Sequence, residues 1–310
     1  MWFWQHAVPF RKLANKSGHP PMKFIDLDTW RAGGSHFTWR NNSIYYRNEG
    51  KSGGDTLLLI HGFPTASWDW HPIWPALAHR FHLLTLDMLG FGFSAKPRDF
   101  PYSIMAQADL FEALLAKAGV QHYRILAHDY GDTVAQELLA RNGQRNQGGP
   151  ELKAICFLNG GLFPETHRPL FLQKVLASPL GPLLAKLTTY AKFKANFERI
   201  CAKPLAEAEL AGMWALLNEN SGRAVMPELI RYMAERRTNR ARWVGALQTT
   251  QLPLQLIDGV DDPISGSHLV ARFRELVPQG RVLELPGVGH YPHVEAPEAV
   301  LAGVLDFFGE

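Results

Sequence analysis

Short apolar runs alternate with stretches of helical periodicity along most of this chain. The runs lie at residues 56–60, 83–86, 125–127, 154–158, 253–258 and 281–285, and each ends in a turn rich in glycine or polar residues. Helical patterns follow them, near residues 68–78, 103–117, 134–139, 268–276 and 297–308. Strands that alternate with helices in this way indicate crossover units and a mostly parallel sheet, hence an α/β fold.

Two further β-rich runs precede the first of these strands. Residues 37–40 and 43–46 are separated by Asn41 and Asn42, residue types that tolerate positive φ angles. The pattern predicts an antiparallel hairpin at the start of the fold.

The alternation stops between residues 163 and 248. This segment has helical patterns near 169–177, 183–197, 206–217 and 228–243, and no convincing strand. We interpret it as a helical cap inserted into a core formed by residues 31–162 and 249–310. Residues 1–30 form a separate N-terminal segment, aromatic and then basic, which could dock on the protein's own surface or at a membrane interface.

Composition narrows the class of protein. With 46% hydrophobic and 20% charged residues the chain has the composition of a globular enzyme, and a net charge of +3 gives no argument for nucleic acid as a partner. No apolar run reaches the length of about 18 residues that a spanning helix needs. Two cysteines, Cys156 and Cys201, form no disulfide framework or metal spacing, which favours a cytoplasmic location, with peripheral membrane contact left open.

One stretch, residues 125–136, has the form of a nucleophile elbow. Its apolar run stops at small residues, Ala127 and Gly131, that flank Asp129, and a helical pattern begins at once. In such a tight turn between strand and helix, the middle residue is held exposed above the sheet. An aspartate is an anion at neutral pH, so it can attack an electrophilic carbon without a base and form an ester. The alternative interpretation is an ordinary helix N-cap.

Two later loops supply partners for this aspartate. Asp262 follows the strand that ends at residue 258, and His290 follows the strand that ends at residue 285. The order nucleophile, acid, histidine is the order found in α/β-hydrolases. We expect His290 to act as general base on water and Asp262 to orient it. Asp261 is the alternative acid, but the Asp-Pro setting favours Asp262.

These motifs resemble the epoxide hydrolase and haloalkane dehalogenase branch of the α/β-hydrolase superfamily. The likeness rests on His61-Gly62-Phe63-Pro64, His128-Asp129-Tyr130-Gly131, Asp262-Pro263 and Gly289-His290, and runs from about residue 37 to the C-terminus. A closer likeness, to the mesoderm-specific transcript protein group, rests on residues 128–132, 159–169 and 242–247. The resemblance implies an α/β-hydrolase fold, with a mostly parallel eight-stranded sheet, helices on both faces and an inserted helical cap.

An ester mechanism of this kind also needs an oxyanion hole. The backbone N–H groups of Phe63 and Tyr130 are expected to form it, the second at a helix N-terminus. No cofactor is expected. A metal site made of His61, His128 and Asp129 lacks any supporting spacing, so none is expected either, and His61 is interpreted as shaping its turn through hydrogen bonds.

The residues that would handle the leaving group depart from the resemblance. Dehalogenases usually place a tryptophan after the nucleophile and an asparagine in the oxyanion turn, where this chain has Tyr130 and Phe63. Epoxide hydrolases use cap tyrosines as acids, one typically just after a tryptophan in the last cap helix, where this chain has Val244. Three cap residues could supply the proton instead, namely His167, Tyr190 and Tyr232.

We therefore expect a hydrolase that works through an Asp129 ester, most like an epoxide hydrolase acting with water on a lipophilic small molecule. Hydrolysis of a carbon–halogen bond is the alternative reaction, and a non-catalytic ligand-binding or interaction protein is the alternative class. The basic stretch 231–242 is interpreted as a solvated helix face, or as a contact for anionic lipid or substrate. The pattern predicts neither the substrate's identity nor the oligomeric state.

Overall fold

One eight-stranded sheet organises the computed structural model, which describes residues 24–51, 53–145 and 148–309. The strand order is β1-β2-β4-β3-β5-β6-β7-β8. Their bounds are β1 (Ser35–Trp39), β2 (Asn42–Gly50), β3 (Thr56–Ile60), β4 (His82–Leu86), β5 (His122–His128), β6 (Glu151–Leu158), β7 (Leu254–Gly259) and β8 (Arg281–Leu285). The pairs β1–β2 and β2–β4 are antiparallel and the others are parallel, which confirms the predicted fold class.

The opening hairpin forms where the asparagines predict it. Arg40 and Asn41 have φ angles of 45° and 63°, so the chain reverses through left-handed backbone between β1 and β2. Most of the expected N-terminal segment, residues 1–23, lies outside the described residues, and its docking stays a prediction.

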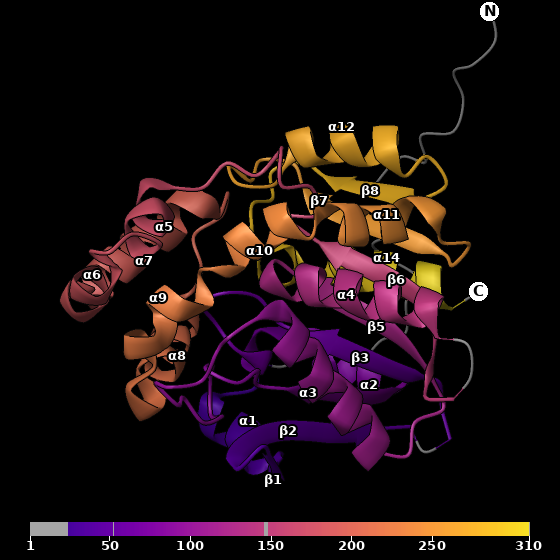
Figure 1. Cartoon of the computed structure of the whole chain (residues 1–310), viewed down its shortest axis with the longest axis horizontal. Helices are drawn as coiled ribbons and strands as arrows, with labels where there is room; N and C mark the ends of the chain where they lie inside the picture. Colours follow the sequence, from indigo (N-terminus) through magenta and orange to yellow (C-terminus); the bar gives the residue numbers. More distant parts are fainter. Residues whose placement is uncertain (1–23, 52, 146–147, 310) are drawn as a thin grey trace, which may run out of the picture.

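Helices cover both faces of the sheet. Their bounds are α1 (Leu27–Ala32), α2 (Trp74–Ala78), α3 (Ile104–Lys117), α4 (Tyr130–Gln144), α11 (Arg240–Thr249), α12 (Ser267–Leu276), α13 (Pro292–Glu295) and α14 (Pro297–Phe308). In Figure 1, α3, α4 and α11 lie in front of the sheet, and α2 and α14 lie behind it. Every residue of β3 and β7 is buried, as the continuous apolar runs predict for strands covered on both sides.

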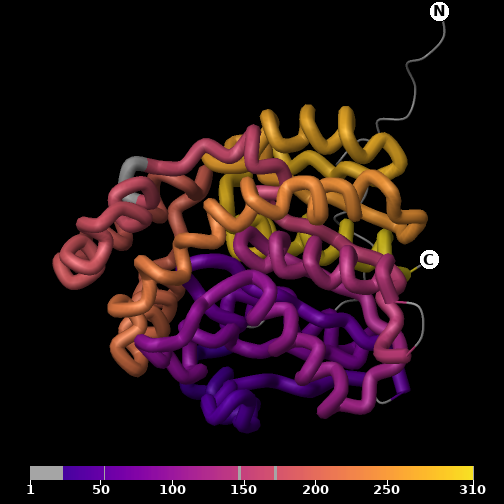
Figure 2. The backbone as a smooth tube through the Cα atoms, in the orientation of Figure 1, coloured from indigo at the N-terminus to yellow at the C-terminus, as the bar shows by residue number. Residues whose placement is uncertain are grey.

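A group of helices lies at one end of the sheet, to the left in Figures 1 and 2. It contains α5 (Phe171–Leu176), α6 (Gly181–Leu187), α7 (Tyr190–Ile200), α8 (Glu207–Asn218), the 3₁₀ segment η3 (Glu219–Val225), α9 (Met226–Leu229) and α10 (Tyr232–Thr238). In Figure 2 the chain leaves the core after β6 and returns through α10 and α11. We refer to residues 163–248, the segment that the sequence predicts to be a cap, as the cap, although α11 itself packs along α4. Across the described ranges, no helix is long and apolar enough to cross a membrane.

Several predicted helices are divided in the structure. Residues 67–70 form a 3₁₀ turn, η2 (Ser67–Trp70), and α2 begins only at Trp74, because Pro72 lacks the N–H that a continuous helix needs. The predicted helix 183–197 is two helices, and Thr189 caps the second by accepting a hydrogen bond from the N–H of Lys192. The predicted helix 228–243 is likewise split among α9, α10 and α11.

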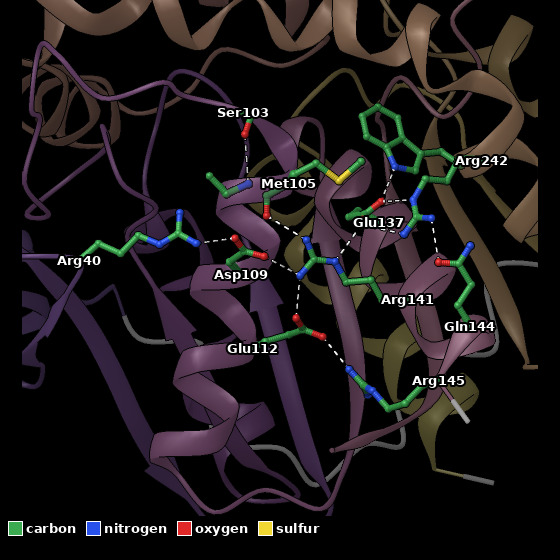
Figure 3. Close-up of polar contacts among 12 residues, drawn as sticks. Arg40, Ser103, Met105, Asp109, Glu112, Glu137, Arg141, Gln144, Arg145 and Arg242 are labelled. Atoms are coloured by element: carbon green, nitrogen blue, oxygen red, sulfur yellow. Dashed lines mark hydrogen bonds and ion pairs between the residues drawn. The ribbon is translucent and has the colours of Figure 1, made fainter. Parts of the chain in front are cut away.

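A buried carboxylate fastens the returning chain to the core (Figure 3). Glu137 of α4 accepts hydrogen bonds from Arg141 on its own helix and from Arg242 and Trp243 of α11, at 2.7–3.0 Å. Burial alone would raise the pKa of Glu137, but these donors outweigh it and lower the pKa below its ordinary value. The carboxylate therefore stays charged and holds α11 against α4.

The basic stretch 231–242 is only partly the solvated face that its charge suggests. Arg240 makes a bidentate ion pair with Glu165, and Arg242 makes an ion pair with Glu137. Arg236 is buried, with only 2% of its surface exposed, and donates to the carbonyl oxygen of Gly161. These three arginines connect the cap to the loop after β6 and to α4. Their guanidinium groups therefore already have partners within the protein.

Candidate active site

Asp129 sits at the tight turn between β5 and α4. Its φ of 49° and ψ of −108° lie outside the ordinary allowed regions for a residue with a side chain, as a nucleophile elbow requires. Gly131 permits the start of α4 to pass close to the end of β3, because a Cβ there would lie 2.3 Å from the carbonyl oxygen of Ile60. The strain is held by buried neighbours, and Asp129 itself is 4% exposed.

The three residues that the sequence predicts as a triad lie together. Nδ1 of His290 lies 2.7 Å from Oδ2 of Asp262, and Nε2 of His290 lies 3.9 Å from Oδ1 of Asp129. All three residues are buried, with at most 4% of their surface exposed. At 3.9 Å, the imidazole of His290 is close to the carboxylate of Asp129 but makes no direct hydrogen bond to it.

Asp262 is held by several donors besides the histidine. The N–H of Ile264 and the hydroxyl of Ser265 donate to it at 2.7 and 2.8 Å, and the amide of Asn159 donates at 3.2 Å. Asn159 also exchanges two hydrogen bonds with the backbone of Gly259, at 2.7 and 3.0 Å. Asn159, at the end of β6, thus fixes the loop that carries the acid.

The alternative acid, Asp261, points elsewhere. It is exposed and accepts a hydrogen bond from the N–H of Gly287 at 3.1 Å. The geometry therefore favours Asp262 as the partner of His290.

A second buried carboxylate holds the histidine loop. Glu295 accepts the N–H groups of Gly289 and Tyr291, on either side of His290, at 2.9 and 3.0 Å. The same side chain accepts the N–H groups of Ala202 and Lys203, in the cap, at 2.8 and 3.1 Å. The sequence does not reveal this role, because Glu295 looks like an ordinary acidic residue just before α14.

The backbone of His290 is also anchored. Its N–H donates to the carbonyl oxygen of Ile200 at 2.9 Å, and its own carbonyl lies 2.7 Å from Nε2 of His128. His128 is buried and directly precedes Asp129 in the chain. It therefore helps to position His290 opposite Asp129.

One of the expected oxyanion donors is already in place. The N–H of Phe63 donates to Oδ2 of Asp129 at 3.0 Å. Tyr130 is the first residue of α4, so its N–H is among the amides that have no partner within the helix. Both donors are buried, which strengthens their interaction with a developing negative charge.

His61 shapes the oxyanion turn, as predicted from its position. Its Nδ1 lies 2.9 Å from the carbonyl oxygen of Gly62, and its Nε2 accepts the N–H of Met88 at 3.1 Å. Burial lowers its pKa to about 4, so the ring is neutral at physiological pH. Both ring nitrogens are engaged in this way, which argues against a metal site that uses His61.

Tyr232, in α10 of the cap, lies near Asp129. Its ring packs 4.6 Å from that of Tyr130, and burial together with the charge of Asp129 raises its pKa. The hydroxyl is buried and has no hydrogen-bond partner among the described residues. Arg236 lies over the ring, 4.6 Å from its centre. A protonated phenol therefore lies beside the Asp129 carboxylate.

The other two candidate proton donors differ from Tyr232. Tyr190 lies at the cap surface, where its hydroxyl donates to Glu207. The ring nitrogens of His167 are buried without partners in the described structure, and burial, with the neighbouring Arg236 and His290 charges, lowers its pKa far below the ordinary value. A histidine held neutral in this way is a weak acid.

An apolar cavity lies between the cap and the candidate triad. Its empty volume is about 680 Å³, part of which is open to solvent. His290, Phe63, Pro64 and Ile264 line it from the core, and Leu170, Gln173, Leu176, Leu184, Thr188, Phe193, Asn196, Phe197, Ile200, Leu217 and Met226 line it from the cap. Its polar lining is sparse, so a lipophilic ligand fits it best.

Electrostatics favour a charged pair of His290 and Asp262 in the resting site. Burial would lower the pKa of His290, but the carboxylates of Asp262 and Asp129 outweigh it and raise the pKa to about 9. Burial would raise the pKa of Asp262, yet His290 and the hydrogen-bond donors lower it. The negative charge of Asp129 thus contributes to keeping the histidine protonated.

Comparisons with known proteins agree with this arrangement. A family model described as alpha/beta hydrolase fold matches residues 55–297. The mesoderm-specific transcript protein of Mus musculus is 41% identical over 300 residues, which are 93% of this chain and 89% of that protein. This similarity confirms the resemblance drawn from the motifs.

Enzymes of defined name are more distant relatives. A cis-3-alkyl-4-alkyloxetan-2-one decarboxylase of Shewanella oneidensis is 26% identical over 92% of this chain and 91% of its own length. Haloalkane dehalogenase 2 of Mycobacterium bovis is 27% identical over 86% of this chain and 91% of its own length. The crystal structure of haloalkane dehalogenase DbeA from Bradyrhizobium elkanii is similar in fold, with a TM-score of 0.76 at 23% identity, covering 89% of this chain and 97% of DbeA. From the family match and the 41% identity we conclude that the chain belongs to the α/β-hydrolase family.

Proposed function

We propose that this α/β-hydrolase opens an epoxide on a lipophilic molecule through a covalent ester of Asp129. The observation that carries the proposal is the buried, unpartnered hydroxyl of Tyr232 beside the Asp129 carboxylate. An epoxide leaves as an alkoxide, which needs a proton, and a phenol kept protonated by burial can donate it. The apolar cavity supports a lipophilic substrate.

In the first step, Oδ1 of Asp129 attacks an epoxide carbon. The carbon–oxygen bond of the ring breaks, and the leaving oxygen takes the proton of Tyr232. The N–H of Phe63 already holds Oδ2, so Oδ1 is the atom left for attack. The product is an ester between Asp129 and one carbon of a β-hydroxy alkyl group.

In the second step, water hydrolyses that ester. His290 takes a proton from water as it attacks the carbonyl carbon of Asp129, and Asp262 stabilises the imidazolium that forms. The N–H groups of Phe63 and Tyr130 stabilise the oxyanion. Its collapse releases the diol, whose leaving oxygen takes the proton from His290. The carboxyl group of Asp129 then loses the remaining proton of the water molecule and the Tyr232 phenolate regains one, both by exchange with solvent.

Ester formation would itself prepare the histidine. Asp129 loses its negative charge when it is alkylated, and that charge is one of the causes of the raised pKa of His290. The pKa should therefore fall in the intermediate, which increases the neutral fraction of His290 when a base is needed.

Hydrolysis of a carbon–halogen bond is the second candidate. The relative named haloalkane dehalogenase 2 favours it. A leaving halide takes no proton and is held by N–H donors instead, and the side chains of Phe63 and Tyr130 offer no N–H. These side chains therefore favour an oxygen leaving group.

A substrate panel tests the proposal. Purified protein is incubated separately with a long-chain epoxide, a long-chain alkyl bromide and a dialkyl oxetan-2-one, and diol, bromide and carbon dioxide are measured. Diol from the epoxide, at a rate lost in Asp129→Asn, supports the proposal. Bromide release without diol would replace it with the second candidate, and turnover of none of them would favour a non-catalytic ligand-binding protein.

A further inference from the structure

Leu183 and Leu187 of α6, together with its N-cap residue Leu180, are the most exposed large apolar side chains in the part of the chain that the structure describes. Leu180, Leu183 and Leu187 are 63%, 57% and 56% exposed. Spacings of three and four residues put them on one face of the helix. In Figure 1, α6 lies at the outer end of the cap, away from the sheet. Exposed leucines grouped in this way are typical of a surface that binds a membrane or another protein.

The charge around these leucines has a single sign. Residues 166–197 contain no Asp or Glu and five basic residues, which are Arg168, Lys174, Lys186, Lys192 and Lys194. Lys194 pairs with Glu207 at 2.7 Å. Lys174, Lys186 and Lys192 are exposed and make no ion pair within the described residues. An apolar face surrounded by free lysines complements an anionic lipid surface.

An adjoining face of the same helix borders the active-site cavity. Leu184 of α6 and Thr188, which directly follows it, line the cavity together with Leu176 of α5. The exposed leucines therefore lie next to the cavity wall on one short helix. A lipophilic molecule that leaves a bilayer at α6 would enter the cavity without crossing bulk water.

We propose that this α6 face, made of Leu180, Leu183 and Leu187 with Lys174 and Lys186, docks on an anionic phospholipid bilayer. The leucines enter the interface, and the lysines contact phosphate and carboxylate groups of the lipids. A second copy of the chain fits less well, because a two-fold contact would place these lysines against their own copies. Docking needs no turnover, so it can be tested separately from the proposed reaction.

Vesicle flotation tests the proposal with the full chain. Vesicles of phosphatidylcholine alone are compared with vesicles that also contain phosphatidylserine, at low and high salt. The wild type should float with the anionic vesicles and be released by salt. Leu183→Asp with Leu187→Asp should reduce the bound fraction about tenfold or more. Lys174→Gln with Lys186→Gln should reduce binding to anionic vesicles by about fivefold per lysine.

A charge-matched pair, Lys51→Gln with Lys153→Gln, is the control, since both exposed lysines lie at the opposite end of the sheet from the cap. It should bind as the wild type does, and thermal unfolding of every variant checks that it is folded. Failure of the wild type to float overturns the proposal. So does unchanged flotation of the double-leucine variant, which would place membrane binding elsewhere in the chain. Sedimentation showing leucine-dependent dimers without vesicle binding would identify the second copy as the occupant.

Discussion

The backbone N–H of Phe63 donates a 3.0 Å hydrogen bond to Oδ2 of Asp129, across the space between the loops after β3 and β5. One carboxylate oxygen is thereby fixed in the oxyanion position, while Oδ1 lies 3.9 Å from Nε2 of His290. The two oxygens thus have different environments before any substrate binds. In the proposed reaction Oδ1 forms the ester bond, and Oδ2 becomes the carbonyl oxygen that carries the charge during hydrolysis.

Replacing Asp262 by asparagine should slow hydrolysis of the ester far more than its formation. The amide keeps the shape but removes the charge that stabilises the imidazolium, and in a serine protease triad the same change costs about 10⁴-fold. We expect kcat to fall by about 10³–10⁴-fold, with the ester accumulating in mass spectra. Asp261→Asn is the matched control and should retain activity. Equal losses in the two variants would show that Asp262 has no special role.

Tyr232→Phe should lower kcat for an epoxide by about 10²-fold or more, with little change in KM, because the leaving oxygen loses its acid. Tyr190→Phe, which removes a hydroxyl bonded to Glu207 at the surface, should leave kcat unchanged. Steady-state kinetics of the two variants give the comparison. If Tyr232→Phe turns over the epoxide as fast as the wild type, another group protonates the oxygen.

The pKa of His290 should depend on the charge of Asp129. The raised value, about 9, includes a contribution from this carboxylate, so Asp129→Asn should lower it. Titration of the imidazole by nuclear magnetic resonance measures the shift directly. An unchanged pKa in Asp129→Asn would mean that alkylation of Asp129 does not prepare the base.

The same pKa predicts how stability varies with pH. Folding raises the pKa of His290 above the ordinary value of 6.5, so its contribution is fully present below about pH 6.5 and is lost as pH rises through about 9. The contribution is roughly 3 kcal/mol. Urea unfolding across this pH range gives the free energy of unfolding of the wild type and of His290→Gln, and the difference between them measures the contribution of His290. His79→Gln, at an exposed position, is the control. A constant difference between wild type and His290→Gln would contradict the prediction.

Glu295→Gln should destabilise the protein and slow catalysis together. The carboxylate accepts four backbone N–H groups, and an amide would set its own N–H₂ against some of them. We expect a loss of about 2–3 kcal/mol in the free energy of unfolding, together with lower activity because the His290 loop is released. Glu298→Gln, at an exposed position of the next helix, is the control. Full stability in Glu295→Gln would rule out this anchoring role.

The sequence predicts the sheet and the elbow well because both follow from local patterns. Continuous apolar runs specify buried parallel strands, and Gly131 with Ala127 specifies the turn that exposes Asp129. The cap is less well predicted, since short interruptions such as Thr188 and Thr189 decide where a helix is divided.

The supporting residues of the site could not be identified from the sequence. Glu295 and Asn159 act through backbone groups that are far away in the chain, as in the bond from Ala202 to Glu295. Tyr232 is one of three candidates, and its burial against Tyr130 distinguishes it from Tyr190, whose hydroxyl donates to Glu207 at the surface. Partners of this kind are brought together by tertiary structure and leave no periodic signal.

The most direct test of the account is to trap the ester. His290→Gln is incubated with the epoxide and digested, and the peptide that contains Asp129 is analysed by mass spectrometry. The account predicts a mass increase equal to that of the epoxide on Asp129, absent from the double variant Asp129→Asn with His290→Gln. No adduct on Asp129, together with inactivation of the wild type by a serine-directed phosphonate, would contradict the aspartate mechanism.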